Sequence, residues 1–287
     1  MADKPKGLPP PPSDRDRAST SGIPLQRHLA ELVNKSCGGR DQTHPQDRQL
    51  WRVEAEEVPA GDGFLDILLI CRTQGNAPIR MAVEVKRFYD ADEGRPQRLL
   101  FLTPRTAARN TNSGPILPYR DPEKTKGRAD LPHRLMAGEF YATLKCPVAE
   151  HCIFEERKGN VTMDGIAREL LAQMEALSIE PVAHGERFAF LPVVVTNAEL
   201  RLLRVGDVDL TSGAMTSGPE NGEVVPWLRY EKTLSRSGLE PVASQGSKDF
   251  TSWASERVRS VYVVQALHFI EFLRRLQLVA PPWERRQ

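Results

Sequence analysis

Two apolar stretches separated by a short turn constrain the fold of this chain more than any other feature. They span residues 64–72 and 79–87, with Gly75, Asn76 and Pro78 between them. Glycine and asparagine tolerate positive φ, and proline has no amide to donate to a strand ladder. The pattern predicts a β-hairpin. Because its arms are apolar almost throughout, we expect both of its faces to be covered.

Three charged residues interrupt the apolar pattern at the open end of this hairpin. Asp66 and Glu84 are each nine positions from Gly75, so folding about that glycine places them opposite each other. Lys86 is two residues beyond Glu84 and leaves the same face of the strand. Charges in apolar surroundings are costly unless they are paired or bound to a ligand. A divalent cation such as Mg²⁺, which takes oxygen ligands, would account for the two carboxylates.

The motif Leu65-Asp66 followed by Glu84-Val85-Lys86 resembles that of the PD-(D/E)XK nuclease superfamily, with Leu65 standing where the family usually has a proline. The resemblance implies an α/β, restriction-endonuclease-like fold, in which helices flank a central mixed sheet. It also implies that Asp66, Glu84 and the carbonyl of Val85 hold Mg²⁺ or Mn²⁺. Lys86 would orient or deprotonate the attacking water.

The function implied by this resemblance is metal-dependent hydrolysis of phosphodiester bonds, in DNA rather than RNA. An alternative is a catalytically inactive module of the same fold that binds nucleic acid or docks a partner. A third interpretation needs no ligand. In it, Asp66, Glu84 and Lys86 form a cross-strand ion pair on a surface hairpin.

Two more residues enter as candidates through the resemblance. Glu31 lies in a predicted helix over residues 24–36, and first-helix glutamates of the family often face the metal. Gln173 falls on the apolar face of a helix that Thr162 is expected to cap. Some branches of the superfamily have a glutamine there that positions the site. The alternatives are a solvated charge at Glu31 and a buried amide satisfied by the backbone at Gln173.

A long insertion, residues 90–160, follows the third strand of the expected fold. Between residues 95 and 134 it contains nine basic and three acidic side chains, an excess of six positive charges in a chain of net charge +1. This segment is the candidate phosphate-binding surface, and a solvated loop is the alternative. The expected nucleic-acid contacts are Arg105, Arg109, Arg120, Lys124, Lys126 and Arg128.

Cysteine usage bears on a possible zinc site and on the cellular compartment. Cys146, His151 and Cys152 lie close in sequence, but their spacing fits no standard zinc site, and packed thiols are the alternative. The chain has four cysteines, a number too low for a disulfide scaffold, so we expect free thiols in a reducing compartment. No signal peptide and no bilayer-length apolar segment is recognised, and the expected location is the cytoplasm.

The domain organisation follows from composition and periodicity. Residues 1–22 are proline-rich and polar, and we expect them to be disordered. Residues 23–280 are expected to form a single nuclease-like domain, followed by a tail at 281–287. Partners other than DNA are left open, including a homodimer or a targeting protein. The remaining expected elements are strands at 49–58, 188–196, 199–205 and 258–264, an extra strand or hairpin at 140–154, mostly loop at 206–250 with a short strand near Trp227, and a helix at 265–276.

Overall fold

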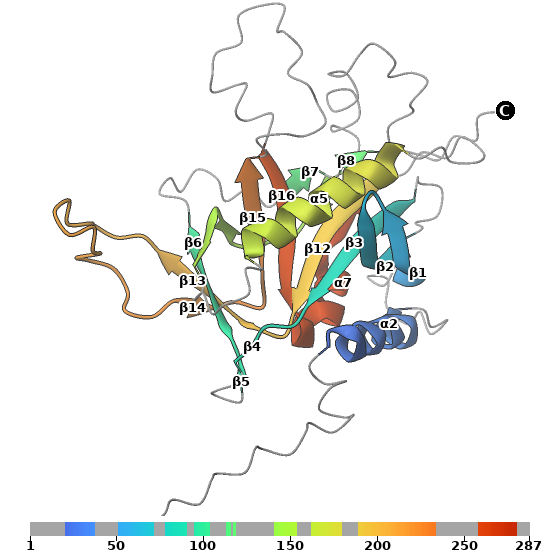
Figure 1. Ribbon diagram of the computed structural model, residues 1–287, viewed down its shortest axis with the longest axis horizontal. Helices are drawn as coiled ribbons and strands as arrows, with labels where there is room; N and C mark the ends of the chain where they lie inside the picture. The colour runs from blue at the N-terminus through green and yellow to red at the C-terminus, as the bar shows by residue number, and fades with distance from the viewer. Residues whose placement is uncertain are drawn as a thin grey trace, which may run out of the picture.

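A mixed eight-stranded sheet forms the centre of the computed structural model, with helices on both of its faces (Figure 1). Residues 1–20 of the expected tail and residues 281–287 lie outside the described part. No helix among the described residues combines the length and the apolar character needed to cross a membrane. The described residues are 21–37, 51–71, 78–90, 95–103, 113–115, 117–118, 141–153, 162–179, 189–233 and 258–279.

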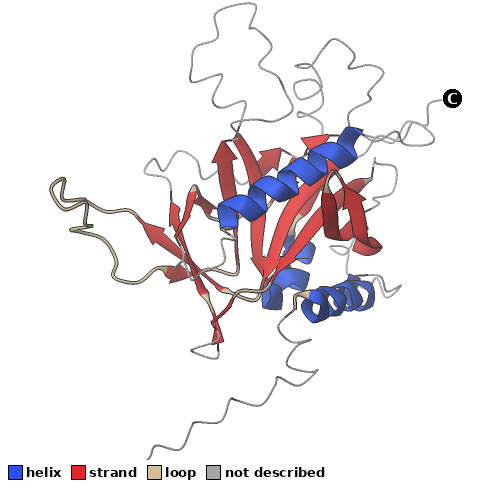
Figure 2. Cartoon of the chain, viewed as in Figure 1, coloured by secondary structure: helices blue, strands red, loops and turns tan. Residues whose placement is uncertain are grey.

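The main sheet begins with an antiparallel meander of three strands and continues with parallel neighbours (Figure 2). β12 lies parallel to both β3 and β16, β15 returns antiparallel to β16, and β10 lies parallel to β15. The architecture is therefore mixed α/β. In spatial order the strands are β1 (Trp51–Ala60), β2 (Gly63–Cys71), β3 (Ile79–Lys86), β12 (Ala189–Thr196), β16 (Val258–Gln265), β15 (Trp227–Thr233) and β10 (Val148–Ala149), and β8 (Leu117–Pro118) pairs with β12.

The predicted hairpin is confirmed as β2 and β3. Its register pairs Cys71 with Ile79 and Ile67 with Val83. In this register Asp66 and Glu84 lie opposite each other on adjacent strands, as their equal sequence separation from Gly75 predicts. Nearly every residue of the two strands between Ile67 and Val83 is buried, so both faces are covered.

Helices cover the two faces of the main sheet unequally. α5 (Met163–Ile179) lies across one face, and its residues Ile166, Leu170 and Met174 share an apolar core with Leu68 and Ala82. On the other face, α2 (Ile23–Cys37) and the short α7 (Phe269–Arg275) share a second core with alternate residues of the same strands. All eight residues of β12 are buried, as its continuous apolar run predicts.

The insertion contributes strands to several sheets of the fold, including the main sheet, which the sequence did not predict. Within residues 140–154, where one strand or hairpin was expected, three short strands join three different sheets. β9 (Tyr141–Thr143) pairs with β7 (Ser113–Pro115) and β17 (Gln277–Val279), while β10 extends the main sheet. The smaller sheets contain β11 (His151–Ile153), β6 (Arg98–Thr103), β13 (Glu199–Arg204) and β14 (Glu223–Val224) in one, and β4 (Tyr89–Asp90) with β5 (Arg95–Pro96) in another.

The C-terminal third departs from the expectation at two places. The segment 206–250, expected to be mostly loop, contributes β15, a strand of seven residues between β16 and β10. The helix expected over 265–276 is split. β16 runs on through Gln265, a 3₁₀ turn covers Ala266–His268, and α7 begins at Phe269. His268 precedes α7 and its ring lies edge-on to Trp227, which is a packing contact.

Candidate active site

Asp66 lies where the pairing of β2 with β3 ends. Its carboxylate Oδ2 accepts a hydrogen bond of 2.7 Å from the backbone amide of Val85. Its own carbonyl accepts a bond of 2.9 Å from the side chain of Gln26, a buried residue of α2. The side chain and the main chain of Asp66 are thus fixed from two directions, by β3 and by α2.

Glu84 and Lys86 form an ion pair along β3, between Glu84 Oε1 and Lys86 Nζ. The pair joins two residues of one strand and does not cross the hairpin. Glu84 is only 5% exposed. Its second oxygen, Oε2, is buried and has no hydrogen-bond partner among the described residues. A buried carboxylate oxygen without a partner is costly, and sites of this kind often bind a ligand or an ion.

The helix α5 brings two polar side chains to the same end of the hairpin. Gln173 is 6% exposed, and its Nε2 donates a bond of 3.3 Å to the carbonyl of Phe64, while its Oε1 is buried without a partner among the described residues. Glu169 lies one helical turn earlier. A methyl group added at Gly63 would lie 3.2 Å from Gln173 Nε2 and 3.9 Å from Glu169 Oε1, so the glycine leaves room for both.

Burial and neighbouring charges together shift the pKa values of Asp66, Glu84 and Lys86. Burial raises the pKa of Asp66, and the Val85 amide and Lys86 only partly offset this effect. Burial likewise raises the pKa of Glu84, against the lowering effect of its bond to Lys86, and Asp66 and Glu169 raise it further. Burial alone would lower the pKa of Lys86, but the bond to Glu84 and the surrounding carboxylates raise it overall. Lys86 is therefore a protonated donor at neutral pH.

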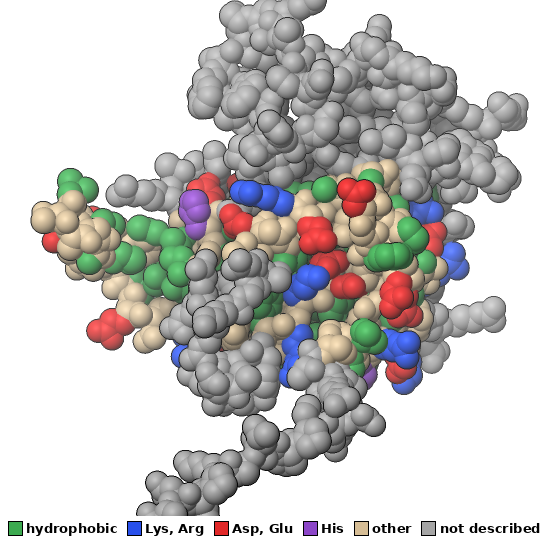
Figure 3. Space-filling view, viewed as in Figure 1, with side chains coloured by type: hydrophobic (Ala, Val, Ile, Leu, Met, Phe, Trp, Pro, Cys, Tyr) green, Lys and Arg blue, Asp and Glu red, His purple; other side chains and the backbone are tan. Residues whose placement is uncertain are grey.

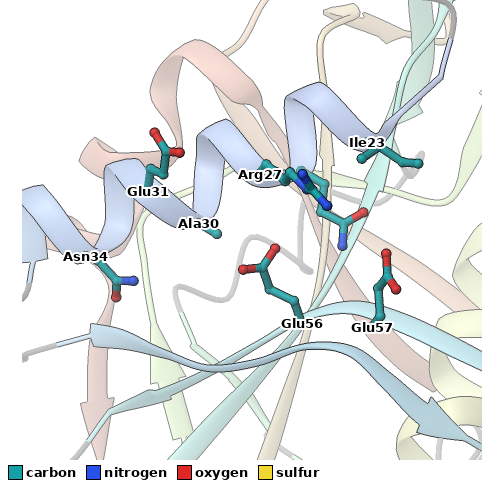
Figure 4. A pocket seen from close by; sticks show the side chains of 8 residues that line it. Ile23, Arg27, Ala30, Glu31, Asn34, Glu56 and Glu57 are labelled. Carbon is teal, nitrogen blue, oxygen red and sulfur yellow. The ribbon is translucent and has the colours of Figure 1, made fainter. Parts of the chain in front are cut away.

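Glu31 lines a pocket whose described lining does not include Asp66, Glu84 or Lys86. It lines this cavity of about 430 Å³ between α2 and β1, together with Glu56 and Glu57. Figure 4 shows its carboxyl group directed away from both of these glutamates. Glu57 is closer to the site, because its charge contributes to raising the pKa of Asp66. It is also the one non-glycine residue with positive φ in the described part of the chain, at 52°.

The structure does not support the zinc alternative. Cys146 is buried in the core beneath α2 and α7, whereas Cys152 packs against the core on the α5 face. Burial raises the pKa of Cys146 to about 11. Within the described ranges, no group of three or more His, Cys, Asp or Glu side chains is placed to hold a metal ion. Packed thiols, the alternative interpretation, describe both residues.

The predicted nucleic-acid contacts stay a prediction. All six lie in gaps between the described ranges: Arg105, Arg109, Arg120, Lys124, Lys126 and Arg128.

Sequence reasoning missed two residues near the site. Gln26 falls on the buried face of α2 with Leu29 and Val33, at helical spacing, so an inward-facing amide was readable from the sequence. Glu169 is one turn before Gln173 on α5, which was also readable. The sequence also allows one of the β1 glutamates, Glu54, Glu56 or Glu57, to lie near the site, and Glu57 is the one whose charge raises the pKa of Asp66.

Two carboxylates in this site could serve as oxygen ligands of a hard cation, and no third His, Cys, Asp or Glu side chain of the described part of the chain joins them in a metal-holding group. Asp66 and Glu84 supply two carboxylates at the same level of adjacent strands, and the orphaned Oε2 of Glu84 is an available donor atom. Magnesium sites commonly use one or two carboxylates, with water and substrate oxygens completing the shell. Val85, whose carbonyl was the third expected ligand, lies between Glu84 and Lys86, with its carbonyl beside Gly22.

Comparisons with known proteins give no relative from which a function could be inferred. No protein-family model matches the chain, and neither the curated proteins nor the solved structures include a match.

Proposed function

We propose that this chain is a metal-dependent nuclease that hydrolyses phosphodiester bonds in DNA. One observation carries the proposal. Asp66, Glu84 and Lys86 meet at one end of the hairpin, and Glu84 keeps a buried oxygen without a partner among the described residues. Structural ion pairs normally satisfy both carboxylate oxygens when they are buried, so this oxygen points to a ligand.

The order of the elements supports a restriction-endonuclease-like fold as part of this proposal. A helix, three antiparallel strands, a helix and a parallel strand occur in this order as α2, β1, β2, β3, α5 and β12, with the short strands β4 to β11 of the insertion between β3 and α5. The carboxylates lie on the second and third strands of this series, as the resemblance of the motif implies.

In the proposed reaction each residue has a distinct task. Asp66, fixed by the Val85 amide, and Glu84 would hold Mg²⁺ or Mn²⁺. A bound cation supplies Lewis-acid stabilisation of charge on the scissile phosphate and lowers the pKa of attacking water. Lys86, protonated at neutral pH, would orient that water and donate to the phosphate. Gln173 would fix the open end of β2 through the Phe64 carbonyl.

Incubation with supercoiled plasmid and with linear DNA, with and without Mg²⁺ or Mn²⁺, tests the proposal. We expect cation-dependent cleavage by the wild-type protein and a loss of at least about 100-fold in Asp66→Asn, Glu84→Gln and Lys86→Met. The matched control is Glu54→Gln, because Glu54 is a β1 carboxylate paired with Arg80 away from the site.

Two results would contradict the proposal. One is cleavage that persists undiminished in Asp66→Asn and Glu84→Gln, which would assign the activity to a contaminant or another site. The other is the absence of cleavage on plasmid, linear duplex, single-stranded DNA and RNA with either cation. The pattern of nicking, linearisation or end digestion distinguishes endonuclease from exonuclease activity.

An inactive module of the same fold is the second candidate. The ion pair between Glu84 Oε1 and Lys86 favours it, since the pair neutralises part of the site without any cation. The two candidates differ in cation binding, because a module without catalysis has no need to bind Mg²⁺ at Asp66 and Glu84.

A further inference from the structure

A hairpin-like extension stands apart from both helical layers. We define the arm as residues 205–222, which join β13 to β14 at the edge of the four-stranded sheet of β11, β6, β13 and β14, here called the second sheet. Figure 1 shows it reaching outward at the left, and Figure 2 shows that it consists almost wholly of loop.

The arm holds its shape through its own hydrogen bonds. The amide of Thr216 donates to the carbonyl of Asp207 at 2.8 Å, and the amide of Asp209 donates to the carbonyl of Ala214 at 2.9 Å. The hydroxyl of Ser217 accepts from the Asp207 amide and donates to the Asp207 carboxylate. The strands also approach closely at Gly206, where a methyl group would lie 1.9 Å from the Ser217 carbonyl. The arm is therefore preformed, which reduces the entropy lost when a partner binds.

This preformed arm exposes apolar side chains that nothing in the described structure covers. Leu210, at its tip, is 97% exposed, and Val208 and Met215, which face each other across an isolated bridge, are 39% and 40% exposed. At the base, Val224 of β14 is 52% exposed. Figure 3 shows hydrophobic atoms spread along the arm. Single exposed apolar residues are ordinary, but a row of them on an ordered projection is typical of a binding surface.

The charges of the arm restrict what it can bind. The arm has three acidic residues and no lysine or arginine: Asp207, Asp209 and Glu220. Glu223 follows it on β14, and Arg204 precedes it on β13. Hydrogen bonds from the Thr211 amide and the Ser212 hydroxyl lower the pKa of Asp209, so it stays charged at neutral pH. An acidic surface repels nucleic acid and anionic lipid, and it is complementary to a basic one.

We propose that the arm is a docking site for a partner protein that presents an amphipathic helix, with an apolar face bordered by lysine or arginine side chains. Leu210, Val208 and Met215 pack against the apolar face, and the acidic side chains face its basic border. The proposal is independent of the nuclease assignment, because the arm is not part of the candidate active site.

Binding of defined peptides to the full chain tests this surface. The probes are two fluorescently labelled amphipathic helices of equal length, one of leucine and lysine and one of leucine and glutamate, measured by anisotropy. The apolar variant is Leu210→Ser with Met215→Ser. The charge variant is Glu220→Gln with Glu223→Gln, which leaves the internal hydrogen bonds of the arm in place. The matched control is Asn221→Ser, an exposed polar change on the same arm.

We expect the leucine–lysine peptide to bind and the leucine–glutamate peptide not to bind. The apolar variant should weaken binding about tenfold or more, and the charge variant should weaken it less and reduce its salt dependence, with no change in the control. Three results would overturn the proposal. They are leucine–lysine binding that is equal in the apolar variant, no binding at all, or sedimentation showing a self-associated wild-type protein that the apolar variant disperses.

Discussion

At the scale of single residues, Glu84 is a buried carboxylate whose interactions only partly offset the cost of its burial. A carboxylate that is 5% exposed would ordinarily have partners for both oxygens, yet Oε2 has none among the described residues. Asp66 and Glu169 add like charge, and Lys86 neutralises only part of it. The site thus stores an unfavourable interaction that a cation would relieve.

The burial of Glu84 predicts how stability responds to pH. The pKa of Glu84 in the folded chain is raised above its ordinary value of 4.5, so protonation of Glu84 stabilises the fold. That stabilisation is fully present below pH 4.5 and is lost as the pH rises through the raised pKa. Glutamine resembles the protonated acid in shape and charge. Without a cation, we therefore expect Glu84→Gln to exceed wild type in unfolding free energy at pH 7.5.

Urea titrations of both proteins between pH 4.5 and pH 8 measure this difference, which should shrink toward the acid end. Glu54→Gln is the control, since it removes a partly exposed carboxylate from a surface pair, which contributes under about 1 kcal/mol. A wild-type protein that stays more stable than Glu84→Gln throughout this range would show that the carboxylate is well satisfied.

At the scale of elements, a polar contact near the start of α5 ties this helix to the sheet. The hydroxyl of Tyr230, on β15, donates a hydrogen bond to the carboxylate of Asp164 in the first turn of α5. The tyrosine is fully buried, and burial raises its pKa, so the hydroxyl stays protonated. Its ring packs edge-on against Phe101 of β6. Tyr230 thereby connects the main sheet, the second sheet and the helix that carries Gln173.

Removing this hydroxyl should loosen α5. We expect Tyr230→Phe to cost about 1.5–3 kcal/mol of unfolding free energy, because the bond is to a charged carboxylate and the ring contact is kept. Chemical denaturation measures the loss, and Tyr230→Leu, which also removes the ring contact, should cost more. Equal stability of Tyr230→Phe and wild type would mean that Asp164 finds water as an equivalent partner.

The elements also show which parts of the fold were readable from the sequence. The hairpin and its register were predicted because a local turn and a symmetric pattern determine them, and so Asp66 and Glu84 were placed correctly at one level. β10 was not predicted, because two residues carry no periodic signal and pair with β15 about 80 positions away. The length of β15 was underestimated, because its neighbours in the sheet, β16 and β10, are distant in sequence.

The same distinction applies to the site. Gln173 was found from helical spacing, and Glu169 and Gln26 were within reach of the same reasoning. Glu31 was placed by analogy with a family, and the structure puts it on the cavity between α2 and β1. Non-local geometry decides which charges share a space, and one sequence does not contain that information.

At the scale of the whole molecule, cation binding and folding are linked. A cation that binds only the folded chain raises the unfolding free energy by RT ln(1 + [L]/Kd), about 2.7 kcal/mol at 100 times Kd. We expect millimolar Mg²⁺ or Mn²⁺ to raise the melting temperature of the wild-type protein by several degrees and to leave Asp66→Asn and Glu84→Gln unchanged. Differential scanning fluorimetry with a calcium and a potassium series measures the selectivity.

Glu54→Gln should show the same shift as wild type. A shift that survives in both site variants would place the bound cation elsewhere, for example near Glu56 and Glu57 in the cavity under α2. A shift in none of the proteins, together with no cleavage, would favour the inactive module.

The position of β16 has a consequence for how the chain is made. This strand comes from residues 258–265, yet it lies in the interior of the main sheet, between β12 and β15. Until the ribosome has released it, β12 and β15 each present an unpaired edge, and such edges recruit other chains. Synthesis therefore passes through a period in which β12 and β15 have been made but the sheet between them is incomplete, and in that period chaperone protection would matter most.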